Sequence, residues 1–371
     1  MPSAVAQTPG PLPLWKRPPK TSVDLPWADI SVIDLSTFDN PGGKEELAKQ
    51  LIHAVETTGF FSVTGTGFTN DEVERQYSIG QAFFNEPKEE KTKQRCDFSV
   101  GNYFGYRGYN EKTVKGTEVL DNVESVNIPK LIPELAHEPR HDFFKPYLPE
   151  IEDFSRRSLA IASKIFTLFA LILELPEDYF SSRHAYASKS EDHLRYMLYH
   201  PRPAAQDALV QNSWARAHTD FGSLTLLWSQ NIAGLQIKTQ SGEWKYHPAR
   251  RRAIICNVGD AMQFWSAGYL KSTIHRVVRP PKDQDSVNRL GLFYFVRPGD
   301  DVDIAPAPSP LLRRLGYITD EDLKQGEGKK RVTGLQYVRE RVKNYHNHNN
   351  YEDRKGKKFK VGNLEIEDEV E

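Results

Sequence analysis

Cysteine is almost missing from this chain of 371 residues, which has only Cys96 and Cys256. The two lie far apart and in no CxxC pair, so the sequence offers neither a disulfide framework nor a zinc ribbon. So few cysteines are typical of proteins in a reducing compartment, and we expect a cytoplasmic protein.

Long apolar runs and an excess of one sign of charge are also missing. No window approaches the ~18 continuous apolar residues of a membrane span. The proline-rich start, Met1 to Lys20, lacks the apolar core of a secretory signal. The 49 basic residues almost balance the 50 acidic ones, so no long-range field selects nucleic acid or an anionic membrane. We expect a soluble, intracellular, globular monomer that has neither as a partner.

The pattern along the chain changes from helical to strand-like at about Leu194. Before it, the segment "IEDFSRRSLAIASKIFTLFALILEL" carries apolar residues at helical spacing. After it, short apolar segments separated by turns recur at the spacing of an antiparallel barrel or jelly roll. The sequence therefore predicts an α+β fold, with a double-stranded β-helix (jelly roll, cupin-like) core and supporting N-terminal and C-terminal helices.

Composition also suggests how the chain is divided. We expect an extended proline-rich tail, one domain behind it, and a charged tail at the end, because the jelly-roll sheet needs helices to cover its outer face. The predicted parts are 1–28 (tail), 29–350 (single domain) and 351–371 (charged tail), with 29–190 mainly helical, 191–300 the jelly-roll core and 301–350 the C-terminal helices.

His218 and Asp220 stand one residue apart in "RAHTDFGSLTLLW". If this segment is a strand, both side chains point to the same face, about 7 Å apart. That geometry suits one metal ion, but a His-x-Asp pair is more often a hydrogen-bonded polar patch. The pair alone leaves both interpretations open.

Two further residues bear on the choice between a metal site and a polar patch. His275 lies in "KSTIHRVV", another apparent strand, where a histidine is by default a core residue. Arg289 begins a strand in which it shares one face with Gly291, Phe293 and Phe295. A buried arginine needs an anionic partner, and a carboxylate fits its guanidinium fork best.

Together, two imidazoles and one carboxylate form the facial triad that suits non-haem Fe(II). Zinc can take the same set, although a zinc hydrolase has no need of the arginine behind it. A metal-binding recognition module without catalysis is a third interpretation of the same residues.

The order "HTDFGSLTLL", "GLQI", "CNVGD", "STIHRVV" and the following arginine resembles one known family. It is that of the Fe(II)/2-oxoglutarate-dependent dioxygenases, in the isopenicillin-N-synthase-like group, which includes plant flavonoid and gibberellin oxygenases and fungal thymine 7-hydroxylase. The resemblance extends to "ISVIDLSTF" and "VETTGFFSVTGTGF" near the start and to "GLQYVRERV" near the end, and so covers most of the chain.

The resemblance implies roles for five residues. His218, Asp220 and His275 would bind Fe(II), Arg289 would pair with the distal carboxylate of 2-oxoglutarate, and Tyr199 would hydrogen-bond this cosubstrate. Dioxygen and 2-oxoglutarate would then yield succinate and CO2 while an unactivated C–H bond of a small, largely apolar substrate is hydroxylated or desaturated. We expect a role in specialised metabolism. The alternative is an oxidase of the same fold that takes its electrons from the substrate and needs no 2-oxoglutarate.

Two positions depart from the family pattern. Gly291 stands where the family usually has a serine, and Met197 where many plant relatives have asparagine. Each lost hydrogen bond would weaken cosubstrate binding by roughly 0.5–1.5 kcal/mol, which lowers affinity without abolishing it.

Aromatic residues around these motifs are the candidates for contact with the substrate. They predict an apolar or aromatic substrate, and the one arginine among them could meet a carboxylate or carbonyl group, although packing in the core is the alternative for each ring. The candidates are Tyr103, Phe104, Tyr106, Arg107, Phe221, Trp265, Phe293 and Phe295.

Overall fold

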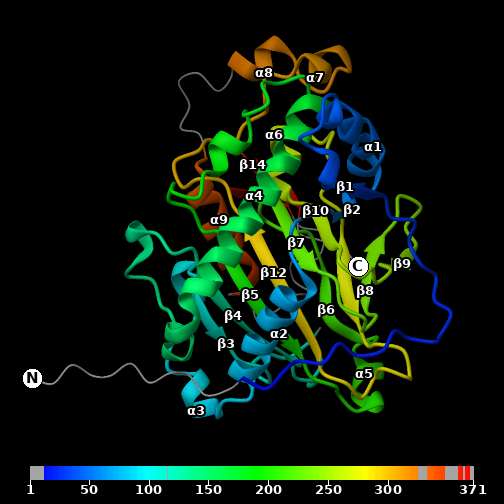
Figure 1. Ribbon diagram of the computed structural model, residues 1–371, viewed down its shortest axis with the longest axis vertical. Coiled ribbons are helices and arrows are strands. Elements are labelled where there is room, and N and C mark those ends of the chain that lie inside the picture. The colour runs from blue at the N-terminus through cyan, green and yellow to red at the C-terminus, as the bar shows by residue number, and fades with distance from the viewer. Residues whose placement is uncertain (1–11, 115, 325–331, 347–357, 362–363, 368–371) are drawn as a thin grey trace, which may run out of the picture.

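Two β-sheets lie at the centre of the protein, and helices cover the outer face of the larger one (Figure 1). The structure is a computed structural model that describes residues 12–114, 116–324, 332–346, 358–361 and 364–367. In these residues the larger sheet has eight strands in the order β1-β2-β10-β7-β12-β5-β4-β3, and the smaller has four in the order β6-β11-β8-β9. All pairs are antiparallel except β1 with β2. Facing sheets of this kind, flanked by helices, are the predicted jelly-roll core.

The described strands are β1 (Val32–Asp34), β2 (Phe60–Thr64), β3 (Gly105–Arg107), β4 (Val123–Pro129), β5 (His193–Tyr199), β6 (Ser213–His218), β7 (Leu224–Trp228), β8 (Leu235–Lys238), β9 (Trp244–Tyr246), β10 (Ile254–Val258), β11 (His275–Val278), β12 (Arg289–Val296), β13 (Lys358–Val361) and β14 (Leu364–Glu367). The described α-helices are α1 (Gly43–Thr57), α2 (Asn70–Phe84), α3 (Lys88–Lys91), α4 (Leu148–Ile172), α5 (Ala204–Leu209), α6 (Asp260–Trp265), α7 (Pro310–Arg314), α8 (Asp320–Lys324) and α9 (Gly334–His346).

Strand β12 shows how the sequence separates core from cavity. Because side chains alternate along a strand, its even-numbered residues, such as Leu292 and Tyr294, face outward into the main core, where α2 and α4 pack on the sheet. Its odd-numbered residues face the other sheet, and Arg289, Phe293 and Phe295 line a cavity between the sheets. One strand thus supplies both packing and site residues.

Three features differ from the sequence expectations or extend them. The glycine- and aromatic-rich segment at 100–110 contains strand β3, which lies before the predicted jelly-roll region. The charged tail at 351–371 contains the β13–β14 hairpin, in which Val361 and Leu364 are buried. In the described part of the N-terminal tail, Trp15 stacks on Tyr77 with ring centroids 4.2 Å apart. The division into domains stays a prediction.

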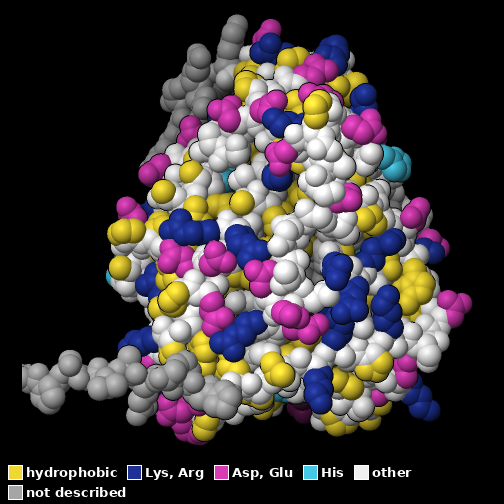
Figure 2. Space-filling view, viewed as in Figure 1, with side chains coloured by type: hydrophobic (Ala, Val, Ile, Leu, Met, Phe, Trp, Pro, Cys, Tyr) yellow, Lys and Arg dark blue, Asp and Glu magenta, His cyan; other side chains and the backbone are white. Residues whose placement is uncertain are grey.

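The surface agrees with the balanced composition. Figure 2 shows acidic and basic side chains interspersed over the face that carries α2 and α4. Within the described ranges, no helix combines the length and the apolar character that crossing a membrane requires.

Candidate active site

His218 and His275 lie opposite one another on neighbouring strands. His218 ends β6, His275 begins β11, and the two are register partners with ring centroids 4.4 Å apart. The Nδ1 atom of each ring donates to a backbone carbonyl, that of Arg216 at 2.8 Å and that of Thr273 at 3.0 Å. The Nε2 atoms are therefore the nitrogens left to bind a metal.

Asp220 completes the group, although not from a strand. Strand β6 ends at His218, so Asp220 lies in the loop that follows, and the expected alternation of both along one strand is wrong. The loop nevertheless brings Asp220 Oδ1 to 3.9 Å from Nε2 of His218 and 3.9 Å from Nε2 of His275. One donor atom from each residue lies within 4.8 Å of the others.

The other carboxylate oxygen of Asp220 is held by two neighbours. Thr225 Oγ1 donates to Oδ2 at 2.6 Å and Asn257 Nδ2 at 2.7 Å. The loop packs so closely on the end of β10 that a Cβ at Gly259 would lie 2.1 Å from the carbonyl oxygen of Gly222. Only glycine fits there, which explains the "CNVGD" motif and leaves Oδ1 turned toward the imidazoles.

The protonation states suit a metal ion. Burial lowers the pKa of His218 to about 3, and the neighbouring His275 adds to this effect. Burial alone would raise the pKa of Asp220, but the two imidazoles and the hydrogen bonds from Asn257 and Thr225 bring it to about 2. Imidazole nitrogen and ionised carboxylate are donors that Fe(II) and zinc both accept.

Arg289 lies in the same cavity and is 4% exposed. Its Nε and Nη1 atoms have no hydrogen-bond partner, and no carboxylate pairs with it among the residues that the structure describes. Burial lowers the pKa of its guanidinium. Tyr199 is its register partner on β5, with the ring centroid 5.5 Å from the guanidinium carbon. The anionic partner that the sequence predicts for Arg289 is therefore not a described side chain of the protein.

The two departures from the family pattern are neighbours in space. Gly291 and Met197 are register partners on β12 and β5. A Cβ at Gly291 would lie 2.5 Å from the ring of Phe293, which occupies the space where a serine side chain would stand. The ring thus accounts for the missing serine, and Met197 lines the same wall of the cavity.

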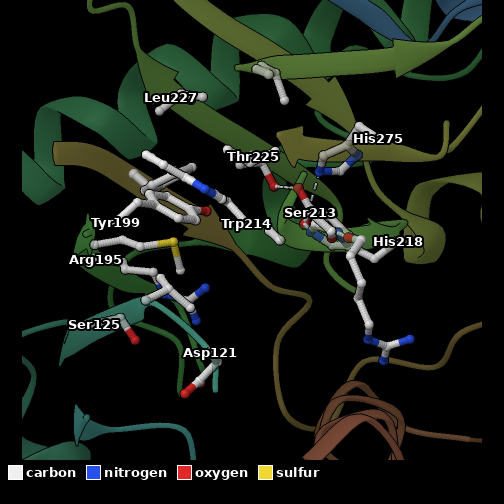
Figure 3. Close-up of a pocket in the computed structure, with 18 of the residues that line it drawn as sticks. Asp121, Ser125, Arg195, Tyr199, Ser213, Trp214, His218, Thr225, Leu227 and His275 are labelled. Carbon is white, nitrogen blue, oxygen red and sulfur yellow. Dashed lines mark hydrogen bonds and ion pairs between the residues drawn. The ribbon is translucent and has the colours of Figure 1, made fainter. Parts of the chain in front are cut away.

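The cavity between the sheets has a volume of about 280 Å³. Figure 3 shows Tyr199, Arg195 and Ser125 across this cavity from His218 and His275. Of the residues that the sequence suggests, ten line it: His218, Asp220, His275, Arg289, Tyr199, Tyr103, Arg107, Phe221, Phe293 and Phe295.

Three predicted substrate residues are not brought to this cavity. Phe104 is 1% exposed and packs edge-on against His193. Tyr106 is also buried, and its hydroxyl donates to Glu124 at 2.7 Å. Trp265 lies in helix α6, with Nε1 donating to the carbonyl of Asp303 at 3.1 Å. These rings are packing residues, which was the alternative for each of them.

Several residues of the site were missed at the level of sequence. Thr225 and Asn257 lie within the quoted motifs "HTDFGSLTLL" and "CNVGD", so the motifs held a signal for them. Arg195 and Arg297 line the cavity as well, but no motif marks them. Arg107, which does line the cavity, forms an ion pair with Asp121.

Two family profiles match the chain and together span most of it. The profile described as "non-haem dioxygenase in morphine synthesis N-terminal" matches residues 30–148. The profile described as "2OG-Fe(II) oxygenase superfamily" matches residues 191–298, the segment that carries both histidines, Asp220 and Arg289. The chain belongs to the 2OG-Fe(II) oxygenase superfamily.

Relatives of this oxygenase cover most of its length. UPF0676 protein C1494.01 of Schizosaccharomyces pombe is 29% identical, covering 77% of this chain and 85% of that protein. Leucoanthocyanidin dioxygenase 1 of Oryza sativa subsp. japonica is 28% identical, covering 76% of this chain and 75% of that protein. Proline hydroxylase buaE of Petromyces alliaceus is 26% identical, covering 85% of this chain and 98% of that protein.

A solved structure confirms the fold. A full-length Neurospora crassa protein, crystallised in complex with alpha-KG, superposes with a TM-score of 0.73 at 24% identity, covering 87% of this chain and 99% of that one. The profile match makes the protein an Fe(II)- and 2-oxoglutarate-dependent oxygenase, and the superposition shows its jelly-roll core. His218, Asp220 and His275 are the group among its described residues that could hold a metal ion.

Proposed function

We propose that His218, Asp220 and His275 bind the Fe(II) of this oxygenase. Two imidazole nitrogens and one carboxylate oxygen match a facial triad, which leaves coordination positions open for other ligands. When bound, Fe(II) supplies the activation of dioxygen that is coupled to the conversion of 2-oxoglutarate into succinate and CO2. Thr225 and Asn257 hold the Asp220 carboxylate in orientation, as outer partners of metal ligands do.

We propose further that Arg289 and Tyr199 bind the distal carboxylate of 2-oxoglutarate. One observation carries the proposal: a buried guanidinium without a described partner shares a cavity with three converging metal-binding atoms. A bidentate carboxylate would satisfy the fork of Arg289. Since Phe293 fills the place of the missing serine, the arginine fork contributes a larger share of this binding than in relatives that keep the serine.

The substrate we propose is a small, largely apolar organic molecule with a C–H bond that is hydroxylated or desaturated. The cavity supports this through Tyr103, Phe221, Phe293 and Phe295, beside Arg107. The names of two relatives, a leucoanthocyanidin dioxygenase and a proline hydroxylase, favour a role in specialised metabolism.

We propose that the protein is a monomer and that it is cytoplasmic. Its two free thiols are in keeping with that compartment.

Succinate release tests this function. The protein is supplied with Fe(II), 2-oxoglutarate and a panel of small organic molecules, and succinate is measured. We expect substrate-dependent succinate, and a loss of roughly a thousandfold or more in His218→Ala because a ligand is removed. Thr225→Val removes one of the two hydrogen bonds to Asp220 Oδ2 and should lower activity by about 10- to 100-fold. Arg314→Gln, an exposed variant away from the cavity, should match the wild type.

Other outcomes would favour the other interpretations. Substrate turnover that continues after rigorous removal of 2-oxoglutarate would support an oxidase of the same fold. Tight zinc with hydrolysis indifferent to oxygen would support a zinc hydrolase. Failure of the anaerobic protein with Fe(II) and 2-oxoglutarate to develop a metal-to-ligand charge-transfer band would support a non-catalytic module.

A further inference from the structure

The inward face of β12 carries an arginine at each end. Arg289 begins the strand and Arg297 directly follows it, and both line the cavity together with Phe293 and Phe295 between them. Eight residues of extended chain separate the two backbone positions by roughly 27 Å. Asp220 lies nearer to the Arg297 end, because Phe295 is the register partner of Thr225, whose hydroxyl bonds the Asp220 carboxylate.

Arg297 is buried without a carboxylate. It is 3% exposed, and its Nε and Nη1 atoms have no hydrogen-bond partner in the described ranges of the chain. Its guanidinium carbon lies 5.8 Å from the ring centroid of Phe221 and 5.6 Å from that of Phe295. A Cβ at Gly222 would lie 3.2 Å from its Nη1 atom, so the guanidinium rests on the loop that carries Asp220. Burial lowers the pKa of its guanidinium, and the charges of Asp220 and Glu191, which act in the opposite direction, do not offset this.

A second arginine approaches the same ring from β5. Arg195 is 6% exposed, and its guanidinium carbon lies 4.4 Å from the centroid of Phe295 and 4.7 Å from that of Tyr103. Its Nε donates to Asn127 Oδ1 at 2.6 Å, an amide that brings no charge. No described carboxylate pairs with Arg195. Two guanidinium groups therefore meet at Phe295 without a negative charge between them.

Cofactor binding does not neutralise these two arginines. The double positive charge of Fe(II) and the single charge of Arg289 are balanced by Asp220 and by the two carboxylates of 2-oxoglutarate. Arg107 is balanced by Asp121. The charges of Arg195 and Arg297 remain, and unpaired charges in a buried cavity are costly. An anionic ligand on this side of the metal would remove that cost.

We propose that the substrate is a carboxylate with an apolar body, and that Arg297, assisted by Arg195, binds its carboxylate on the side of Asp220 away from Arg289. The inference rests on the proposed function, since it takes Arg289 to be occupied by 2-oxoglutarate. The guanidinium fork of Arg297 matches a planar carboxylate. The rings of Tyr103 and Phe295 line the cavity beside Arg195 and offer apolar surface to the body of such a ligand.

Matched acids and amides test the proposal by binding. The probes are benzoate, phenylacetate and 3-phenylpropanoate, each with its amide, and phenyl phosphate as a different oxyanion. They are titrated anaerobically into protein loaded with Fe(II) and saturating 2-oxoglutarate, with calorimetry as the readout. We expect at least one acid to bind about tenfold or more tightly than its amide.

Variants locate the binding site of the acid. Arg297→Met should weaken binding of that acid by about tenfold or more, with amide binding changed by less than about twofold. Arg297→Lys, which keeps the charge but loses the fork, should lie between the wild type and Arg297→Met, and it decides the matter if the methionine variant does not fold. The charge-transfer band of the Fe(II)–2-oxoglutarate complex should be retained in both.

Three results would overturn the inference while that band is intact. They are acids that bind no better than their amides or not at all, acid binding that is unchanged in both Arg297 variants, and a preference for phenyl phosphate over every carboxylate. Absence of the band in the wild-type protein would instead contradict the proposed function, so the two failures are distinguishable.

Discussion

Two groups of arginines differ in their partners, one beside β6 and one in the cavity. Arg202 donates from Nε to Asp207 Oδ1 at 2.9 Å, and Arg279 donates to the other oxygen of Asp207 at 2.6 Å. Arg289 and Arg297 are buried at least as deeply, yet each has two nitrogens without a hydrogen-bond partner among the described residues.

The presence or absence of a carboxylate partner distinguishes arginines that stabilise the fold from those available to bind a ligand. An ion pair such as Arg202 with Asp207 is already formed in the folded chain, so removing one partner leaves an uncompensated charge in a low dielectric. Arg289 and Arg297 carry that cost in the ligand-free protein, and only an anion from outside can remove it. Substitutions in the two settings should therefore have different effects on the free energy of unfolding.

The largest expected effect on stability is that of Arg202→Met. It removes one of the two arginines that bond Asp207, and the other, Arg279, is shared with Asp285. We therefore expect the free energy of unfolding to fall by about 3–5 kcal/mol. Chemical denaturation measures the change, with Arg314→Met as the exposed control, expected to lie within about 0.5 kcal/mol of wild type. An unchanged denaturation midpoint in Arg202→Met would contradict the distinction between the two settings.

Arg289→Met should behave in the opposite way. The metal-loaded variant should be no less stable than wild type without cosubstrate, because an unpaired buried charge is removed. Added 2-oxoglutarate at 100 times its wild-type Kd should stabilise the wild type by about 2.7 kcal/mol and the variant by much less. Anaerobic thermal unfolding gives both values, and equal stabilisation of the two proteins would exclude Arg289 as the anchor.

The smallest effect concerns the position where the family keeps serine. Gly291→Ser should lower the free energy of unfolding by about 1 kcal/mol, because its Cβ would meet the Phe293 ring. In a Phe293→Ala background the same change should be neutral and should tighten 2-oxoglutarate binding several-fold through the added hydroxyl, about 0.5–1.5 kcal/mol. A double-mutant cycle measures the coupling; purely additive effects would show that the ring does not replace the serine.

Much of the metal site could be predicted from the sequence, because its residues lie in compact motifs with fixed spacing. His218, His275 and Arg289 were singled out in this way, and the structure brings the three into one cavity. Their roles toward a metal and a cosubstrate stay predictions. The position of Asp220 was predicted less well. The pattern cannot show that β6 ends at His218 and that Gly259 lets the next loop turn back.

The two settings of arginine could not be told apart from the sequence. Arg195 and Arg202 stand seven residues apart (202 − 195) in one segment, "LRYMLYHPRP". Arg202 meets Asp207 within a local turn, whereas Arg195 faces Phe293 across the sheet. Whether an arginine has a counter-ion depends on which side chains the fold places beside it, and the spacing of apolar residues does not show this. For the same reason Phe104, Tyr106 and Trp265 were expected to line the cavity although they pack in the core.

The account depends most on Arg289 as the partner of the cosubstrate at an Fe(II) site. An anaerobic absorption titration of Fe(II)-loaded protein with 2-oxoglutarate tests this directly, using wild type and Arg289→Met. The account predicts a saturable metal-to-ligand charge-transfer band in the wild type and an apparent Kd raised about 30-fold or more in the variant. A missing band in the wild type, or the same Kd in both proteins, would contradict it.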